Sequence, residues 1–136
     1  MPPLHRSVAT LRFWGDDLDP DWLSQVLGCK PTSSRTRTST TVSTGITRTY
    51  KNWHLKAPDC EPEDLDYQVS ELLGKLTQDL SVWAMLTERY HVDLFCGLFM
   101  EDSSEGVSIS VDTLLALGKR GIKLGLDIYA PDQITK

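Results

Sequence analysis

Two aspartates and a tyrosine on expected strands are the residues whose types and positions could support chemistry. Asp127 and Tyr129 lie on the face of the last expected strand that is opposite its apolar residues, and Asp93 lies on another expected strand. Two carboxylates in one site can act as general acid and general base, because each changes the pKa of the other. The alternative is a solvated sheet face, or an aspartate bonded to backbone or to an arginine. We therefore regard these three as candidate binding residues on an open sheet face, with no catalytic role assigned.

The sequence contains no other motif for catalysis, metal binding or cofactor binding. It has no G-x-S-x-G nucleophile elbow, no phosphate-binding glycine loop, and no histidine or cysteine pair at metal-ligand spacing. The three histidines are His5, His54 and His91. We therefore predict no bound metal and no cofactor, and the sequence favours a protein that is not an enzyme.

Length, cysteines and hydropathy predict one domain in the cytoplasm. Residues 1–136 are expected to form a single domain, because a chain of this length can bury enough apolar surface for one core. Cys29, Cys60 and Cys96 are odd in number and widely spaced, which indicates reduced thiols. No apolar run approaches the roughly 20 residues of a membrane span, and the first residues lack the apolar core of a signal peptide. We expect no membrane association.

The charge is divided unevenly along the chain. From Trp22 to Pro58 there is no Asp or Glu, and the basic residues there are Lys30, Arg35, Arg37, Arg48, Lys51 and Lys56, a charge of +6. The remainder holds eight of the 14 basic residues and all 19 acidic ones, a charge of −11. This basic segment predicts a surface for an anionic partner: an acidic protein, a phosphorylated ligand or RNA. Nucleic acid fits least well, because the pI is near 5.1.

The alternative is that the basic segment lies against the acidic body and lowers its self-repulsion. The candidate binding residues in this segment are Arg35, Arg37, Arg48, Lys51 and Lys56.

Residues 32–49 form a Thr/Ser-rich basic arm. Eight threonines and four serines occupy its 18 positions. Threonine is suited to exposed strands, and Ser43-Thr44-Gly45 can form a hairpin turn. Alternatively the arm is a mobile polar loop, since only Val42 and Ile46 could anchor it. We favour an exposed hairpin with a flexible tip.

The chain from Gly106 to Tyr129 is expected to organise the fold. It is predicted to contain a short strand at 107–109, a helix capped by Ser110 and Gly121, and a strand over 122–129. We expect Leu114 and Leu126 in the core. The other expected elements are a strand over 7–14, a helix from Asp19-Pro20 to Gly28, a strand over 50–56, a long helix over about 63–80, its continuation or a second helix over 79–89, and a strand over 91–100.

These elements predict an α+β fold. Strands with one apolar face and helices with one apolar stripe favour a two-layer sandwich, in which helices cover one face of a mostly antiparallel sheet. The strand–helix–strand order occurs in both halves, which suggests a ferredoxin-like arrangement.

Several segments resemble the domain of unknown function 4279 family, a mostly bacterial group. The resembling segments are Leu11-Arg12-Phe13 with the helix Leu23 to Leu27, the turn Pro31-Thr32, the strand Trp53-His54-Leu55, the helix Leu72-Leu73…Leu76, and the ending Gly121-Ile122…Leu126-Asp127-Ile128-Tyr129. In the middle, Thr/Ser-rich residues stand where the family has a Lys/Arg-Gly turn. The resemblance implies a compact α+β fold and no particular reaction.

Three functions fit these observations. The first is a non-enzymatic protein-binding module that docks an acidic protein, with an immunity-like role against a toxin as one form. The second is a small-molecule-binding protein or enzyme with a site on the open sheet face. The third is a self-associating domain, a homodimer joined through an edge strand.

Overall fold

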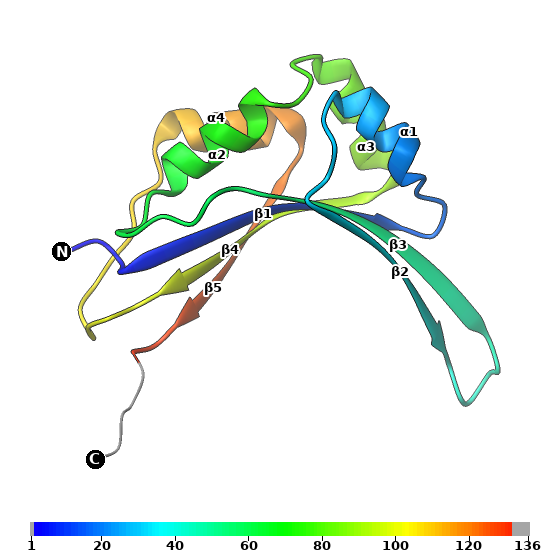
Figure 1. The fold of residues 1–136 in the computed structure, drawn as a ribbon, viewed down its shortest axis with the longest axis horizontal. Coiled ribbons are helices and arrows are strands. Elements are labelled where there is room, and N and C mark those ends of the chain that lie inside the picture. The colour runs from blue at the N-terminus through cyan, green and yellow to red at the C-terminus, as the bar shows by residue number, and fades with distance from the viewer. Residues whose placement is uncertain (1, 132–136) are drawn as a thin grey trace.

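The computed structural model describes residues 2–131, apart from the side chain of Arg37. This part of the chain contains four helices and five strands, and Figure 1 shows their arrangement. Their bounds are β1 (Arg6–Gly15), α1 (Pro20–Leu27), β2 (Ser33–Thr40), β3 (Thr47–Lys56), α2 (Leu65–Gly74), α3 (Leu80–Arg89), β4 (His91–Phe99), α4 (Val111–Arg120) and β5 (Lys123–Tyr129).

The five strands form one mixed sheet in the order β2-β3-β1-β4-β5. β1 lies at its centre and pairs antiparallel with β3 and β4, and β2 pairs antiparallel with β3. β5 pairs parallel with β4, because helix α4 returns the chain to the edge of the sheet before β5 begins. The α+β class is confirmed, while the sheet is mixed and not purely antiparallel.

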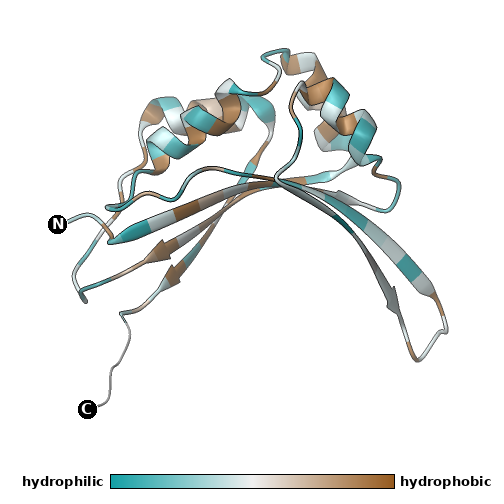
Figure 2. Cartoon of the chain, in the orientation of Figure 1, coloured by the Kyte–Doolittle hydropathy of each residue, from teal (hydrophilic) through white to brown (hydrophobic). Residues whose placement is uncertain are grey.

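All four helices cover the same face of the sheet, and the opposite face is open (Figure 1). Alternation along β1 explains the core: Ala9, Leu11 and Phe13 are fully buried beneath the helices. The ring of Phe13 lies between those of Trp53 and Trp83, at centroid distances of 5.5 and 6.0 Å. Figure 2 shows the apolar colour in the helices and the strands beneath them, whereas the outer β2–β3 hairpin is mostly polar.

The helix ends follow the expected capping residues. Asp19 accepts from the backbone N–H of Trp22, and Ser110 accepts from that of Thr113. Gly28 and Gly121 end α1 and α4 in the left-handed conformation, with φ of 81° and 70°.

The long helix expected over about 63–80 is shorter, and of the two alternatives for residues 79–89 the second helix is the one observed. α2 ends at Gly74 and α3 begins at Leu80, with Asp79 as its N-cap. The indole N–H of Trp83 donates to the carbonyl of Thr77 at 2.9 Å and holds the connection against α3. The expected strand at 107–109 is not formed; the chain there is irregular and leads into the cap of α4.

The prediction that Leu114 and Leu126 are core residues is wrong, since they are 50% and 39% exposed. α4 turns Thr113 and Leu117 towards the other helices, so Leu114 lies on the outer side. Leu126 is in register with the buried Cys96, but within residues 2–131 no further strand adjoins β5, so Leu126 lies on an edge strand.

The Thr/Ser-rich arm is a hairpin. β2 and β3 pair over eight positions, from Ser33 opposite His54 to Thr40 opposite Thr47. At the tip, the N–H of Gly45 donates to the carbonyl of Thr41, and Gly45 has a φ of 67°. The hairpin extends beyond the helices (Figure 1), which explains how a strand with almost no apolar residue can lie at this edge.

Candidate functional site

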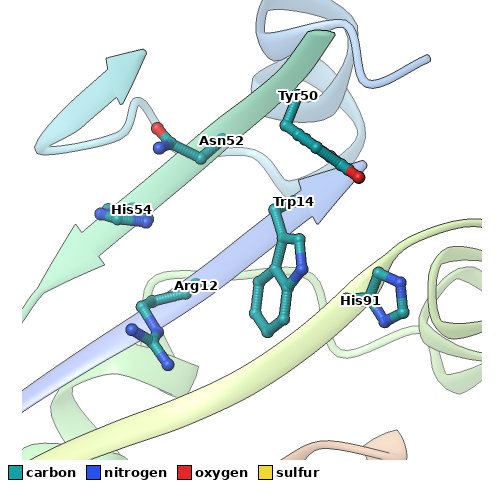
Figure 3. A pocket seen from close by; sticks show the side chains of 6 residues that line it. All are labelled: Arg12, Trp14, Tyr50, Asn52, His54 and His91. Atoms are coloured by element: carbon teal, nitrogen blue, oxygen red, sulfur yellow. The ribbon is translucent and has the colours of Figure 1, made fainter. Parts of the chain in front are cut away.

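The open face of the sheet carries the most distinctive group of side chains. The residues of β1, β3 and β4 that alternate with the buried ones point to this face. Across the middle of the sheet they line a shallow hollow of about 590 Å³ (Figure 3). The lining residues are Arg12, Trp14, Tyr50, Asn52, His54 and His91.

Arg12 and Asp93 form a cross-strand ion pair beside this hollow. The Arg12 Nε and Nη2 atoms donate to the two Asp93 carboxylate oxygens at 2.8 and 2.7 Å. The hydrogen bond to Asp93 raises the pKa of Arg12, and this effect outweighs desolvation. The guanidinium lies 4.6 Å from the Phe95 ring centroid. Arg12 is therefore fixed in position, and its charge is largely neutralised by Asp93.

Aromatic rings form the base of the hollow at its other end. Trp14 and His91, which are opposite each other in register, stack with centroids 5.3 Å apart and planes 18° from parallel. Tyr50 and Asn52 project from β3 beside them (Figure 3). The Asn52 side-chain oxygen accepts from the Arg35 backbone N–H at 2.8 Å, which ties the hairpin edge to the hollow.

A second aromatic pair lies at the far end of the open face. The rings of Phe99 and Tyr129 stack at 4.8 Å, and the Arg6 guanidinium lies 4.2 Å from the centroid of Phe99. The Phe99 ring lies close to Gly97, where a Cβ atom would be in van der Waals contact with the ring at 3.4 Å. Tyr129, one of the expected binding residues, is thus part of a packed aromatic cluster, at a separate hollow that it shares with His5 and Arg6.

The structure does not bring Asp93 and Asp127 together as an acid–base pair. In the parallel register Asp93 is opposite Lys123 and Asp127 is opposite Gly97, four residues or about 13 Å along the strand. Asp93 is bonded to Arg12. Asp127 makes a smaller electrostatic contribution to the raised pKa of Arg12. Both carboxylate oxygens of Asp93 accept from Arg12, so this carboxylate is engaged in the cross-strand ion pair.

The expected basic residues are divided between the two faces of the hairpin. Arg35 is opposite Asn52 in register. Arg48 and Lys56 stand at even spacings from Tyr50, Asn52 and His54 and share their face, so these cations face the open side. Lys51 is two residues from the buried Trp53 on β3 and shares its face, so it points to the helix side instead. Arg37 is opposite Tyr50, and its side chain lies outside the described part of the structure.

The hairpin does not lie against the acidic body. Among the described side chains of the basic arm and the strand that follows it, Lys56 forms the one ion pair, with Asp59 at 3.4 Å. Within the part of the chain that the structure describes, the exposed Arg35 and Arg48 have no acidic group at ion-pair distance and face solvent on the open side.

Sequence reasoning missed most of the hollow. Arg12, Trp14, Tyr50, Asn52 and His91 come from three strands that are distant in sequence. The available signal was the position of Arg12 on the polar side of an alternating strand. That signal marks a face, but it does not show which strands lie next to each other.

The described residues contain no cluster of three or more histidine, cysteine or acidic side chains that could hold a metal ion. Cys96 is fully buried, and burial raises the pKa of its thiol to about 12, so it stays protonated near neutral pH. Within the same residues, no helix is long and apolar enough to cross a membrane.

Residues 4–131 match the domain of unknown function DUF4279. The chain belongs to this family. The match covers nearly the whole chain, including the open face and the hairpin, and it confirms the resemblance seen in the sequence. No curated protein and no solved structure matches the chain.

Proposed function

We propose that this DUF4279 chain is a non-enzymatic binding module that holds an acidic polypeptide segment on the open face of its sheet. The observation that carries the proposal is the hollow over β1, β3 and β4, lined by aromatic, amide and basic side chains. An immunity-like role, in which the acidic segment belongs to a toxin, is one form of this function.

Charge supports an acidic partner. Arg35 and Arg48 are exposed beside the hollow, and the segment from Trp22 to Pro58 contains no acid that could compete for them. Of the two carboxylates that the strands place on this face, Asp93 is already bonded to Arg12, and Asp127 lies on the edge strand β5, on the far side of β4 from the hairpin. Positive surface of this kind steers an acidic partner and raises its association rate.

Shape supports an extended segment as the occupant. The hollow crosses three strands and is broadly open (Figure 3), so a chain can cross it without entering an enclosed cavity. Trp14 and Tyr50 offer large, rigid rings, which are favoured anchors at protein interfaces.

A small anionic ligand is the second candidate. The volume of about 590 Å³ lies in the range of about 300–1,000 Å³ that is common for ligand pockets. A thermal-shift screen with metabolites and nucleotides tests it, since a ligand at 100 times its Kd adds about 2.7 kcal/mol of stability.

The main test measures binding of a fluorescent Asp/Glu-rich peptide by anisotropy. The double variant R35E/R48E is compared with K30E/K51E, which changes the net charge equally at exposed or half-exposed positions away from the open face. We expect the first variant to weaken binding by about tenfold or more, ~1.4 kcal/mol, and the second to have a much smaller effect. Binding should also weaken as salt is added.

Equal losses in the two variants would mean that only overall charge matters, and the open face would not be the site. Retained binding in R35E/R48E would also contradict the proposal. W14A tests the aromatic surface separately, because it removes the indole ring and leaves the net charge unchanged. It should weaken binding of the peptide as well.

We also infer a ferredoxin-like, two-layer arrangement extended by α4 and β5. The order β2-β3-β1-β4 with antiparallel neighbours supports this inference, because it is the order of two interleaved strand–helix–strand units. A cytoplasmic location and a bacterial origin are part of the same proposal. The three free cysteines support the location.

A further inference from the structure

We propose that two copies of this chain form a symmetric dimer in which β5 pairs antiparallel with β5 of the partner subunit, centred on Gly125. This surface is distinct from the hollow on the open face. The result would be a continuous sheet of ten strands with a two-fold axis at its centre.

The backbone of β5 is available for this pairing. Among the residues that the structure describes, β5 is an edge strand and is joined to β4 on one side only. The carbonyl of Tyr129 accepts from the N–H of Met100 and therefore points towards β4. Because backbone groups alternate along a strand, those of Leu124, Leu126 and Ile128 point towards the open edge. An edge of this kind is a template for another strand.

The sequence of β5 is self-complementary. From Ile122 to Ile128 it runs Ile-Lys-Leu-Gly-Leu-Asp-Ile, which has the same chemistry in both directions apart from the opposite charges. Centred on Gly125, antiparallel pairing places Lys123 opposite the partner's Asp127, and Leu124 opposite the partner's Leu126. Opposite charges and apolar pairs directly across a sheet are both stabilising.

The side-chain pattern selects this register over its neighbours. Centring the pair on Lys123 or on Asp127 would place like charges opposite each other at the axis. Centring it on Leu124 would place Lys123 opposite the partner's Gly125, and centring it on Leu126 would place Lys123 opposite the partner's Tyr129. Of these five registers, only the one centred on Gly125 pairs Lys123 with Asp127. It also makes Leu124 and the partner's Leu126, whose backbone groups face outwards, a hydrogen-bonded pair.

Exposed apolar side chains on β5 and α4 support a second copy of this chain as the partner at the β5 edge. Leu126 and Ile128 are 39% and 58% exposed although they share the helix-side face with the buried Cys96 and Leu98. Val111, Leu114 and Leu115 of the adjoining α4 are also at least half exposed. The opposite edge, β2, has serine, threonine and arginine instead, so it offers neither apolar cover nor opposite charges.

The first experiment measures the mass of the full chain by size exclusion with light scattering. We expect twice the chain mass of 15.3 kDa. Lys123→Asp should shift the protein towards monomer, because the new carboxylate would then be opposite the partner's Asp127. The double variant K123D/D127K exchanges the charges and should restore the dimer. Lys30→Asp, at an exposed residue after α1, is the matched control and should leave the mass unchanged.

The second experiment tests the register by cross-linking in a chain that carries Cys29→Ser and Cys60→Ser. Gly125→Cys should form an intermolecular disulfide on oxidation, because directly opposed residues lie about 4.5–5.5 Å apart between Cα atoms. A Cβ at this position is tolerated, because the nearest atom of another strand, the Leu94 carbonyl oxygen, would be 3.9 Å away. Lys123→Cys should not cross-link, since the two copies of residue 123 would be about 13 Å apart.

A monomeric mass at every concentration tested would overturn the proposal. A dimer that K123D leaves intact, or that cross-links as well through residue 123 as through residue 125, would place the interface elsewhere and overturn it too. Dimer loss in K123D with recovery in K123D/D127K would support the charge pairing itself, because a general loss of folding would not be reversed by a second substitution.

Discussion

Leu114 and Leu117 stand three residues apart on α4 and have different surroundings. Leu117 is 3% exposed, whereas Leu114 is 50% exposed. We predict that Leu117→Ala lowers the free energy of unfolding by about 2–5 kcal/mol. Leu114→Ala should change it by no more than about 0.5 kcal/mol. Urea unfolding at low protein concentration, where association does not contribute, measures both. Equal costs would mean that α4 faces the core differently.

A buried amide at Gln68 joins the start of β1 to α2. Its side-chain oxygen accepts from the Ser7 hydroxyl at 2.7 Å, and its side-chain nitrogen donates to the carbonyls of Ser7 and Pro58 at 3.0 and 2.9 Å. Gln68→Leu would leave buried polar atoms without partners, so we predict a loss of about 1–3 kcal/mol in unfolding free energy. The control is Gln25→Leu, at an exposed position of α1. A Gln68 variant as stable as this control would contradict the argument.

At the scale of an element, α4 has one glycine inside the helix and one at its C-cap, and the two have opposite requirements. Gly118 is inside the helix and has open space around it, whereas Gly121 has a φ of +70° and lies close to Thr87. Gly118→Ala should therefore stabilise the protein by about 0.5–1 kcal/mol. Gly121→Ala should destabilise it by about 1–2 kcal/mol, because a Cβ atom is strained in the left-handed region. The thermal unfolding midpoints of the two variants should shift in opposite directions. A shift in the same direction would contradict the role of Gly121 as the left-handed C-cap of α4.

The N-terminus of α4 is tied to α2 by one carboxylate. Asp66 accepts from the Ser110 backbone N–H at 3.0 Å and from the Thr113 hydroxyl at 2.7 Å. The bond from Ser110 is the main cause that lowers the pKa of Asp66 below its ordinary value of 3.8.

This lowered pKa predicts a pH dependence. A carboxyl group whose folded pKa is depressed contributes stability that is complete above the unfolded pKa and is lost as pH falls through the folded value. Asp66→Asn should therefore be less stable than the original chain at pH 7, and the difference should narrow below about pH 4. Urea unfolding from pH 7 to pH 3 measures this. The variant Asp102→Asn, in an exposed turn, should show no such narrowing.

At the scale of the whole molecule, the sheet is unevenly supported. β1 lies between two strands and beneath the helices, while the outer part of the β2–β3 hairpin is exposed and extends past them (Figure 1). We predict that amides of β1 exchange most slowly. In β2, protection should fall from Ser33 towards Thr40, since local opening there exposes little apolar surface. Hydrogen exchange resolved by residue measures this gradient; uniform protection along β2 would contradict it.

The sequence by itself determined the local structure of this protein. The helix caps at Asp19, Ser110 and Gly121 and the alternating burial along β1 could be predicted, because each depends on neighbouring residues and on the period of a helix or strand. Composition also favoured a hairpin within residues 32–49, and the separately expected strand over 50–56 is part of its second strand, β3. These are properties of short segments, and short segments are what periodicity describes.

Only the tertiary structure decided which faces meet. Leu126 has the pattern of a core residue, but its strand lies at the edge of the sheet. Ile122 is therefore buried and Leu124 half-buried, whereas Leu126 is exposed. Arg12 and Asp93 are 81 residues apart in sequence and bond because β1 and β4 are neighbours. Strand order, sheet edges and helix cover depend on long-range packing, which a one-dimensional pattern does not encode locally. For that reason the hollow on the open face emerged from the fold, while its individual residues gave little sign of it.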